Sequence, residues 1–250
     1  MISLSIAGNV ATVTLCRQPV NAINEEWLNQ LSAAIDRIEA TVEISVVRIN
    51  SSARAFCAGA DLALMSSRFE TAEGRDLMIS FVRRLQQVYA RIENLNAVSI
   101  AEIAGAAMGG GFELALACDL RVIAETAKVG LPEAKLGLLP GAGGTQRMTR
   151  KCGDNVARRL ILGAETVDGV LARELGIAHW CVPAGEIGDF TSKLAKRVSA
   201  STGAALAECK RCIEAAGDEA QDGYALELTG TLALLETEQT QTRVRRFLNG

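Results

Sequence analysis

The chain has 250 residues, of which 49% are hydrophobic and 22% are charged, a composition typical of a folded globular protein and unlike that of a disordered or fibrous one. Its net charge of -3, with arginines and acids interleaved, gives little electrostatic reason to expect nucleic acid or an anionic membrane as the main partner. No apolar run is long enough to span a bilayer, and the first residues alternate like a strand instead of forming a signal or transit peptide. We therefore expect a cytosolic protein with no nucleic-acid partner and no membrane partner.

The N-terminal part is predicted to begin with β structure and to continue into a helix. Ile2 to Ile6 and Val10 to Leu15 alternate around Gly8 and Asn9, a pattern that predicts a hairpin. Asn24 is a candidate N-cap for the helix that follows. The apolar residues of that helix recur at helical spacing and are interpreted as core packing; they are Trp27, Leu28, Leu31, Ile35 and Ile38.

Three later apolar segments are short and largely continuous, as expected for strands that are buried on both faces. They are Ile44 to Ile49, Val98 to Ile103 and Leu120 to Ala124, and they alternate with helix-like stretches, so the sequence predicts an α/β fold. From about Asp189 onward the strand signals cease. Successive helical patterns follow there, at Phe190 to Ala200, Ala204 to Ala216 and Ala225 to Glu238. We therefore expect a core over residues 1–188 and a helical region over 189–250, whose apolar surface is buried against another subunit.

Cysteine and histidine offer little chemistry in this chain. Seven cysteines, an odd number in a chain of this size, favour reduced thiols. Cys209 and Cys212 form a C-x-x-C with a helical pattern around it and no second pair, so we expect no metal site. His179 lies in the strand-like run Ile177 to Val182 and has no G-x-S-x-G serine to serve, which favours a structural role.

Three segments carry candidate chemistry. Phe56 to Leu62 (FCAGADL) places small residues where a ligand can approach the backbone closely. Gly109 to Leu114 (GGGFEL) places three glycines at the start of a predicted helix over Glu113 to Cys118, where free N–H groups can bind an oxyanion. Leu131 to Arg147 (LPEAKLGLLPGAGGTQR) places a glutamate at a proline-initiated helix start. The glycine runs fit neither the dinucleotide nor the P-loop pattern, and tight packing is the alternative reason for them.

Two carboxylates stand beside this glycine-rich and apolar backbone. Taken alone, Glu113 or Glu133 is most simply a capping acid at a helix N-terminus. Taken together, near a candidate oxyanion site, they form the acid/base pair that addition of water to an alkene requires.

In this order the three segments resemble the signatures of the crotonase (enoyl-CoA hydratase/isomerase) family. The likeness covers nearly the whole chain and is most specific from Gly105 to Arg147, with a weaker match at Pro19 to Asn24 (PVNAIN). The resemblance implies a crotonase-like spiral of ββα units with a C-terminal helical trimerisation region, and commonly a dimer of trimers. It also implies an acyl-CoA thioester substrate, as in fatty acid metabolism, with coenzyme A as part of the substrate and neither a separate cofactor nor a metal.

Carried over position by position, the resemblance makes the backbone N–H groups of Ala60 and Gly110 the oxyanion hole. It makes Glu113 the general base and Glu133 the group that holds the water and delivers a proton. The expected substrate-binding positions lie beside these residues: Ala58, Asp61, Leu62, Gly109, Pro132 and Gly141. Because both glutamates are present, we expect hydration of a 2-enoyl-CoA to a 3-hydroxyacyl-CoA. The alternative is an enoyl-CoA delta isomerase or another acyl-CoA enzyme of the family.

A more remote alternative is RNA binding, because one branch of the family binds AU-rich RNA through a lysine-rich helix. The corresponding stretch here, Arg68 to Glu93, mixes arginines with acids, which disfavours that function. Val129 and Leu131 stand where the commonest hydratases carry an aromatic residue and a glutamine, so the acyl chain length stays unassigned. Ser66 to Asp76 is polar and weakly periodic, and is expected to be a loop over the acyl chain or an ordinary exposed connection.

Overall fold

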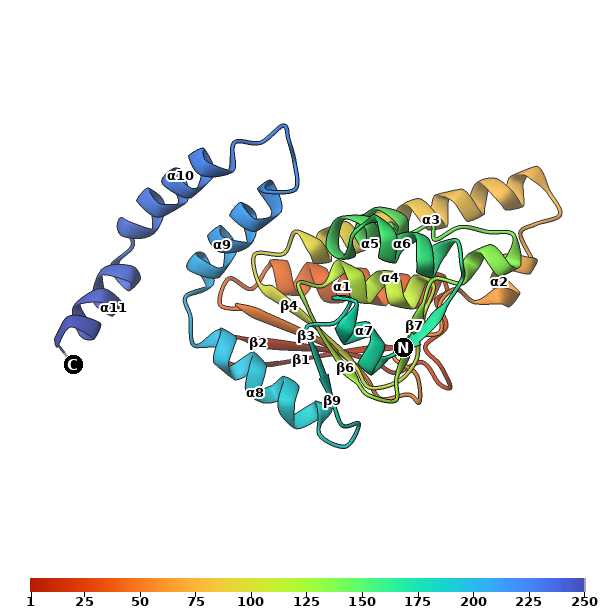
Figure 1. Ribbon diagram of the computed structural model, residues 1–250, viewed down its shortest axis with the longest axis horizontal. Coiled ribbons are helices and arrows are strands. Elements are labelled where there is room, and N and C mark those ends of the chain that lie inside the picture. Colours follow the sequence, from red (N-terminus) through yellow and green to blue (C-terminus); the bar gives the residue numbers. More distant parts are fainter. Residues whose placement is uncertain (250) are drawn as a thin grey trace.

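The computed structural model describes residues 1–249 and is built around a six-stranded sheet (Figure 1). The strands lie in the order β1-β2-β3-β4-β6-β9. β1 and β2 are antiparallel across the turn at Gly8, whereas all other neighbours are parallel. The predicted hairpin and the predicted α/β class are both confirmed. The strands are β1 (Ile2–Ala7), β2 (Val10–Leu15), β3 (Val46–Ser51), β4 (Val98–Ile103), β6 (Leu120–Ala124) and β9 (Trp180–Val182).

A second, three-stranded sheet is formed by β5 (Ala107–Met108), β7 (Lys128–Gly130) and β8 (Thr166–Asp168). Its first pair is parallel and its second pair is antiparallel. β5 and β7 follow directly after β4 and β6 of the large sheet. The segments that leave the carboxyl ends of the parallel strands are therefore gathered at one edge, which is where α/β proteins commonly bind ligands.

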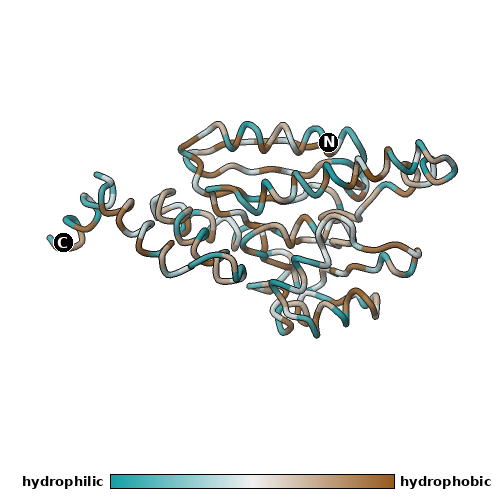
Figure 2. The backbone as a smooth tube through the Cα atoms, turned by 90° about the horizontal axis from the view of Figure 1, so that it is seen from above, coloured by the Kyte–Doolittle hydropathy of each residue, from teal (hydrophilic) through white to brown (hydrophobic). Residues whose placement is uncertain are grey.

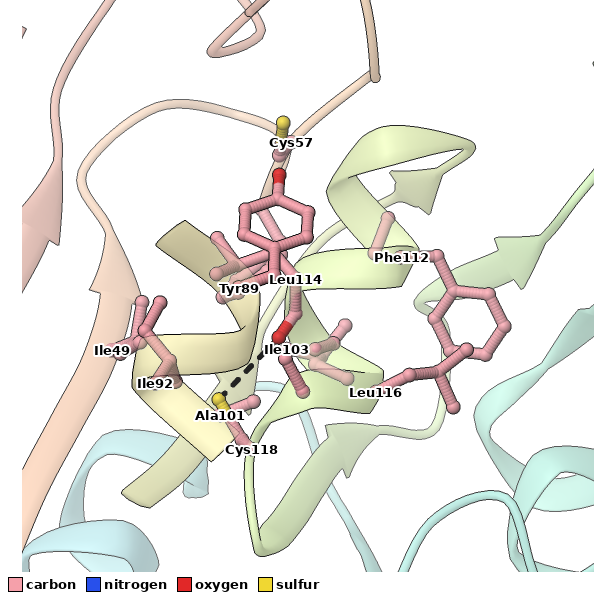
Figure 3. Close-up of a cluster of buried hydrophobic side chains, with 14 of the residues drawn as sticks. Ile49, Cys57, Tyr89, Ile92, Ala101, Ile103, Phe112, Leu114, Leu116 and Cys118 are labelled. Atoms are coloured by element: carbon pink, nitrogen blue, oxygen red, sulfur yellow. Dashed lines mark hydrogen bonds between the residues drawn. The ribbon is translucent and has the colours of Figure 1, made fainter. Parts of the chain in front are cut away.

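Helices cover both faces of the large sheet (Figure 1). α1 (Glu25–Glu39), α3 (Ala72–Glu93) and α4 (Gly110–Ala117) enclose the main core with one face. In that core Ile49 of β3 and Ile103 of β4 lie beside Tyr89 of α3 and Leu114 of α4 (Figure 3). α8 (Ile187–Ser199) covers the other face, where Arg48 of β3 donates to its Ser192 side chain and Gly188 carbonyl.

The expected N-terminal helix forms as the sequence predicts. The Asn24 side chain accepts a hydrogen bond from the Trp27 amide, which satisfies one of the free donors of the first turn of α1. All five apolar residues of the predicted stripe are buried. This stripe therefore fixes the orientation of α1 on the sheet.

Short helices fill several of the connections between the strands. The loop expected over Ser66 to Asp76 is shorter than predicted, because Ser66 ends α2 and Ala72 begins α3. The Thr71 side chain accepts from the Gly74 amide and so caps that helix. The short helices are α2 (Leu62–Ser66), η1 (Glu133–Leu136), α5 (Gly144–Cys152), α6 (Asp154–Ile161) and α7 (Gly169–Glu174).

The C-terminal region is helical, as predicted, and extends away from the core as an arm (Figures 1 and 2). The arm comprises α9 (Gly203–Ala215), α10 (Gly223–Leu235) and α11 (Glu238–Asn249). The predicted division at residue 189 falls near the start of α8, which packs on the sheet. The arm therefore begins after Ser199, and Lys210 of α9 still holds its base to the core through the Leu95 carbonyl and Asp119. From residue 1 to residue 249, no helix is long and apolar enough to cross a membrane.

The packing of α4 against the loop after β3 leaves no space at Gly111. A Cβ at this position would overlap the carbonyl oxygen and the side chain of Cys57, both of which are fixed by the fold. We predict that Gly111→Ala lowers the free energy of unfolding by roughly 1 to 3 kcal/mol, in spite of the better helix propensity of alanine. Gly185→Ala is the matched control, because a Cβ there meets nothing within 4 Å. Equal denaturation midpoints for the two variants would contradict this account of the packing.

Candidate active site

The loop after β3 is held between two neighbouring segments by backbone hydrogen bonds. Cys57 pairs with Ala107: its amide donates to the Ala106 carbonyl (3.1 Å) and its carbonyl accepts from Met108 (2.9 Å). Three residues after Cys57, Ala60 pairs with Ile23: the Ile23 amide donates to the Gly59 carbonyl (2.8 Å), and the Ile23 carbonyl accepts from the Asp61 amide (2.9 Å). This alternation of bonded and unbonded residues leaves the amide of Ala60 facing away from its neighbour.

The turn that opens α4 leaves a second amide without a partner. Gly109 has φ +50°, its amide donates to the Gly130 carbonyl (3.0 Å), and its carbonyl accepts from the amides of Phe112 and Glu113. Gly110, the first helical residue, has no residue before it in the helix to which its amide can donate. The hydroxyl of Tyr89, a buried residue of α3, donates to the Gly110 carbonyl (2.8 Å) and fixes this turn from the side of the core.

The two candidate oxyanion donors are close together. A Cβ on Gly59, whose φ is +93°, would lie 2.8 Å from the Met108 carbonyl oxygen and 3.5 Å from the Gly110 nitrogen. The two backbones therefore touch at this point, and only glycine permits the contact. Within residues 1–249, neither the Ala60 amide nor the Gly110 amide donates a hydrogen bond. Two adjacent free donors at a helix N-terminus can hold an oxyanion.

The carboxylate of Glu113 is buried one turn into α4, with a relative exposure of 2%. Its Oε1 accepts hydrogen bonds from the amides of Ala142 (2.8 Å) and Gly144 (2.7 Å). Burial, and to a lesser extent the nearby Glu133, raise the Glu113 pKa, whereas the two amides and Arg147 lower it; the net result is a pKa of about 7. A carboxyl with a pKa near neutrality can accept and release a proton under physiological conditions.

Glu133, the first residue of η1, approaches the same turn from the other side. A Cβ on Gly109 would lie 2.8 Å from Glu133 Oε1, and a Cβ on Gly110 would lie 3.8 Å from Glu113 Oε2. The Oε2 atom of Glu133 is buried and has no hydrogen-bond partner within the described residues. Burial raises the pKa of Glu133 as well. The two predicted carboxylates therefore converge on the Gly109–Gly110 turn and its free amide.

The remaining predicted positions differ in exposure and in their contacts. Asp61 caps α2 through its amide contacts and forms an ion pair with Arg17 (2.7 Å), and the hydrogen bond from Arg17 lowers its pKa. Ala58 and Leu62 are exposed and lie two residues before and after Ala60 in the chain. The structure thus brings Gly109 and the two glutamates together at one turn, with Ala58 next to the glycine that touches this turn. The Asp61 carboxylate is used within the fold.

Two further predicted positions belong to the loop on the Glu133 side. Pro132 precedes η1 as its N-cap residue. The Gly141 carbonyl accepts from the Gln86 side chain (2.6 Å), so this glycine is tied to α3. Both positions shape the backbone on which Glu113 and Glu133 depend.

The groups that support Glu113 and the Gly110 turn were not predicted from the sequence. Tyr89 belongs to the apolar face of α3, and its ring lies among the core side chains (Figure 3). Its hydroxyl nevertheless donates to the Gly110 carbonyl, a role that its place in the apolar pattern does not reveal. Ala142 and Gly144 act through their backbone amides, which side-chain identity does not reveal. The only signal available was that a glycine run follows the second glutamate.

The lone histidine has a structural role, as the sequence predicted. His179 Nδ1 accepts from the Arg121 amide (3.0 Å), and the His179 amide donates to the Arg121 carbonyl (2.9 Å). Burial and the positive charge of Arg121 lower the His179 pKa to about 4, so the ring stays neutral. Cys209 and Cys212 are free thiols on α9.

Comparisons with known proteins identify the class to which this fold and site belong. The family model for enoyl-CoA hydratase/isomerase matches residues 5–249, so the chain belongs to this family, the crotonase family, and is one of its enzymes.

Two relatives and one solved structure illustrate the similarity. A probable mitochondrial enoyl-CoA hydratase 2 of Arabidopsis thaliana is 38% identical over 78% of this chain, an alignment that spans only 63% of the relative's length. The 2,3-dehydroadipyl-CoA hydratase of Escherichia coli K12 is 34% identical over 91% of this chain and 87% of its own length. The crystal structure of an enoyl-CoA hydratase from Bacillus anthracis superposes with a TM-score of 0.92 at 28% identity, covering 99% of this chain and 96% of that one. The expected crotonase-like fold is therefore confirmed.

The raised pKa of Glu113 predicts a pH-dependent loss of stability. The unfolded chain releases this proton near the ordinary pKa of 4.5, but the folded chain keeps it until about 7, so stability falls as the pH rises between these values. Glu113→Gln removes this titration. Its free energy of unfolding should exceed that of the wild type by up to about 3 kcal/mol at pH 8, and the difference should vanish near pH 4.

Denaturant titrations across this pH range measure the effect. Glu43→Gln, a change at an exposed glutamate, should give a curve parallel to that of the wild type. A parallel curve for Glu113→Gln as well would show that the folded protein does not hold Glu113 at a raised pKa.

Proposed function

We propose that this enzyme adds water across the 2,3 double bond of a 2-enoyl-CoA to give a 3-hydroxyacyl-CoA. The observation that carries the proposal is the convergence of Glu113 and Glu133 on a turn whose Gly110 amide is free, next to the free amide of Ala60. The relatives named as hydratases support the same reaction. Coenzyme A enters as part of the substrate, and the reaction requires no separate cofactor.

The thioester carbonyl is the group that the two free amides would bind. When an oxygen nucleophile attacks C3 of a 2-enoyl thioester, the electron pair of the double bond moves toward the carbonyl and negative charge collects on its oxygen. Donors from Ala60 and Gly110 that are already in place stabilise this charge without reorganisation, and removal of one such donor typically costs roughly 3 to 4 kcal/mol of barrier.

The carboxylates divide the proton transfers between them. Ionised Glu113 takes one proton from water through its Oε2, because Oε1 already accepts from two amides, and the water oxygen forms the bond to C3. Protonated Glu133 gives its proton to C2 as the enolate collapses, so the elements of one water are added and the pair is left with its protons exchanged. Mutual repulsion between two buried carboxylates favours a pair in which one carboxyl is protonated and the other is ionised, before and after the reaction.

Replacing either glutamate tests the paired mechanism. Glu113→Gln and Glu133→Gln should each lower turnover of a 2-enoyl-CoA by roughly 10²- to 10⁴-fold, because each removes one proton transfer, while CoA-ester binding is largely retained. Loss of the absorbance of the conjugated thioester, with acyl chains of graded length, measures hydration. Glu43→Gln is the control.

Two outcomes would change the assignment. Full hydratase activity in either single variant contradicts the two-carboxylate mechanism. Double-bond isomerisation that persists in Glu113→Gln, with no hydration by the wild type, would assign the chain to the isomerase alternative.

We further propose that the C-terminal arm joins copies of this chain into a trimer or a dimer of trimers. The arm exposes large apolar side chains that a peripheral helix pair does not normally expose: Tyr224, Leu228, Leu232, Leu235, Val244, Phe247 and Leu248. Burying such a surface contributes roughly 25 cal/mol for each Å² removed from water. The length of the arm, which projects beyond the core, suits contact with a second copy (Figure 2).

Light scattering of the full-length protein tests this assembly. The mass should be a multiple of three chains, and a double variant with Leu228→Asp and Leu232→Asp should shift it toward single chains, because charge would be buried in the interface. Val42→Asp, a change at an exposed apolar residue outside the arm, should leave the mass unchanged. A monodisperse monomer of the wild type would contradict the proposal.

A further inference from the structure

Arg147 is a buried cation that the proposed reaction does not use directly. It lies in the first turn of α5, and its side chain is only 7% exposed. Its Nη1 donates to the Ala142 carbonyl (2.9 Å), and its own amide donates to the Gly143 carbonyl (2.9 Å). The guanidinium also lies directly against Gly143, where a Cβ would overlap it. The arginine therefore contacts the backbone of two consecutive residues in the loop over residues 141–144.

The same loop holds the catalytic carboxylate. Ala142 accepts from Arg147 through its carbonyl and donates to Glu113 through its amide (2.8 Å). The second donor to Glu113, the Gly144 amide (2.7 Å), lies two residues further along, after Gly143. Displacement of this loop would therefore move both donors away from Glu113 Oε1 together.

Glu93 holds Arg147 in this position. It is the last residue of α3, and its Oε2 accepts from Arg147 Nε (2.8 Å). Its other oxygen faces Arg150 (3.0 Å) and Lys151 (3.3 Å), whose side chains are far more exposed. Burial opposes ionisation of Glu93, but the charges of Arg147, Lys151 and Arg150 keep its pKa below the ordinary value.

We propose that Arg147, held by Glu93, is a positioning residue for Glu113, because it fixes the loop over residues 141–144 whose two amides orient that carboxylate. The inference rests on the proposed role of Glu113 as the base. It makes α3 a support for both halves of the site: Tyr89 holds the Gly110 turn, and Glu93 holds the Glu113 loop one helical turn further along.

Arg147 acts on Glu113 through its positive charge as well as through its hydrogen bonds to the loop. The ionisable groups that face Glu113 are Glu133 of η1, Arg147 of α5 and Tyr89 of α3. Of these, Arg147 alone favours the ionised form of Glu113. Loss of this charge should raise the pH at which the base ionises, whereas loss of the Glu93 charge cannot raise it.

Three variants separate positioning from a merely structural role. Arg147→Met should lower turnover roughly 10- to 100-fold by misplacing the base, and should shift the acidic limb of the pH–rate profile to higher pH by up to about one unit. Arg147→Lys should keep the midpoint of the acidic limb at its wild-type pH, because the positive charge remains. Its turnover should lie between those of Arg147→Met and the wild type, because lysine cannot donate to Glu93 and to the Ala142 carbonyl in the same geometry. Glu93→Gln should lower turnover without shifting the acidic limb of the pH–rate profile to higher pH. Arg150→Gln, which removes an exposed partner of Glu93, is the control and should match the wild type.

A readout independent of turnover distinguishes this proposal from the proposed function. Titration of the Glu113 side-chain carboxyl in unliganded protein, followed by carbon-13 NMR and assigned with Glu113→Gln, should show the same upward shift in Arg147→Met. An unshifted titration together with unchanged turnover would overturn the positioning role. If the wild type hydrates no enoyl-CoA, the proposed function fails, but this titration still decides the role of Arg147. If Arg147→Met does not fold, wild-type turnover in Glu93→Gln overturns the proposal.

Discussion

A buried carboxylate that accepts two backbone hydrogen bonds is the interaction on which the rest of this site depends. Burial of Glu113 opposes ionisation, and two amide donors offset part of that cost by satisfying one of its oxygens. The other oxygen is left facing the Gly110 turn. The balance produces a group that is neither a permanent anion nor a permanent acid, and this is the property that proton transfer at neutral pH requires.

This arrangement explains why glycine recurs around the site. A Cβ on Gly144 would lie 2.8 Å from Glu113 Oε1, so a side chain there would displace the carboxylate that the Gly144 amide holds. Gly59 likewise allows the loop after β3 to touch the Gly110 turn, because a Cβ there would overlap the Met108 carbonyl. The parallel strands bring these segments together, because each segment follows the carboxyl end of a strand in the same sheet. One edge of the sheet therefore brings together the backbone contacts and the carboxylates of the candidate site.

Local sequence patterns correctly predicted the elements that are determined by residues close together in the chain. The strands Val98 to Ile103 and Leu120 to Ala124 have the bounds that continuous apolar runs suggested, and Asn24 caps α1 as expected. The strand expected over Ile177 to Val182 begins only at Trp180, because the amides of Ile177 and Ala178 donate back to the Ala172 carbonyl of α7.

Other elements depended on contacts that local patterns do not contain. The strand expected from Ile44 begins at Val46, since the Ile44 amide is used in a turn with Thr41. α4 begins at Gly110, three residues before the predicted start, because glycine gives no helical pattern. The glutamates were found from their glycine-rich surroundings, but the loop that holds Glu113 and the ion pair that holds this loop join α3, α4 and α5. Such contacts link residues far apart in the chain and leave no periodic signal.

The vibrational spectrum of a bound thioester tests most directly whether Glu113 and the two free amides meet at one substrate carbonyl. A 2-enoyl-CoA with a carbon-13 carbonyl, bound to the unreactive Glu113→Gln variant, reports the hydrogen bonds that its carbonyl oxygen accepts. If Ala60 and Gly110 donate to this oxygen, the carbonyl stretch should fall well below its frequency in water. A bound ester whose stretch matches that of the free ester would contradict the account.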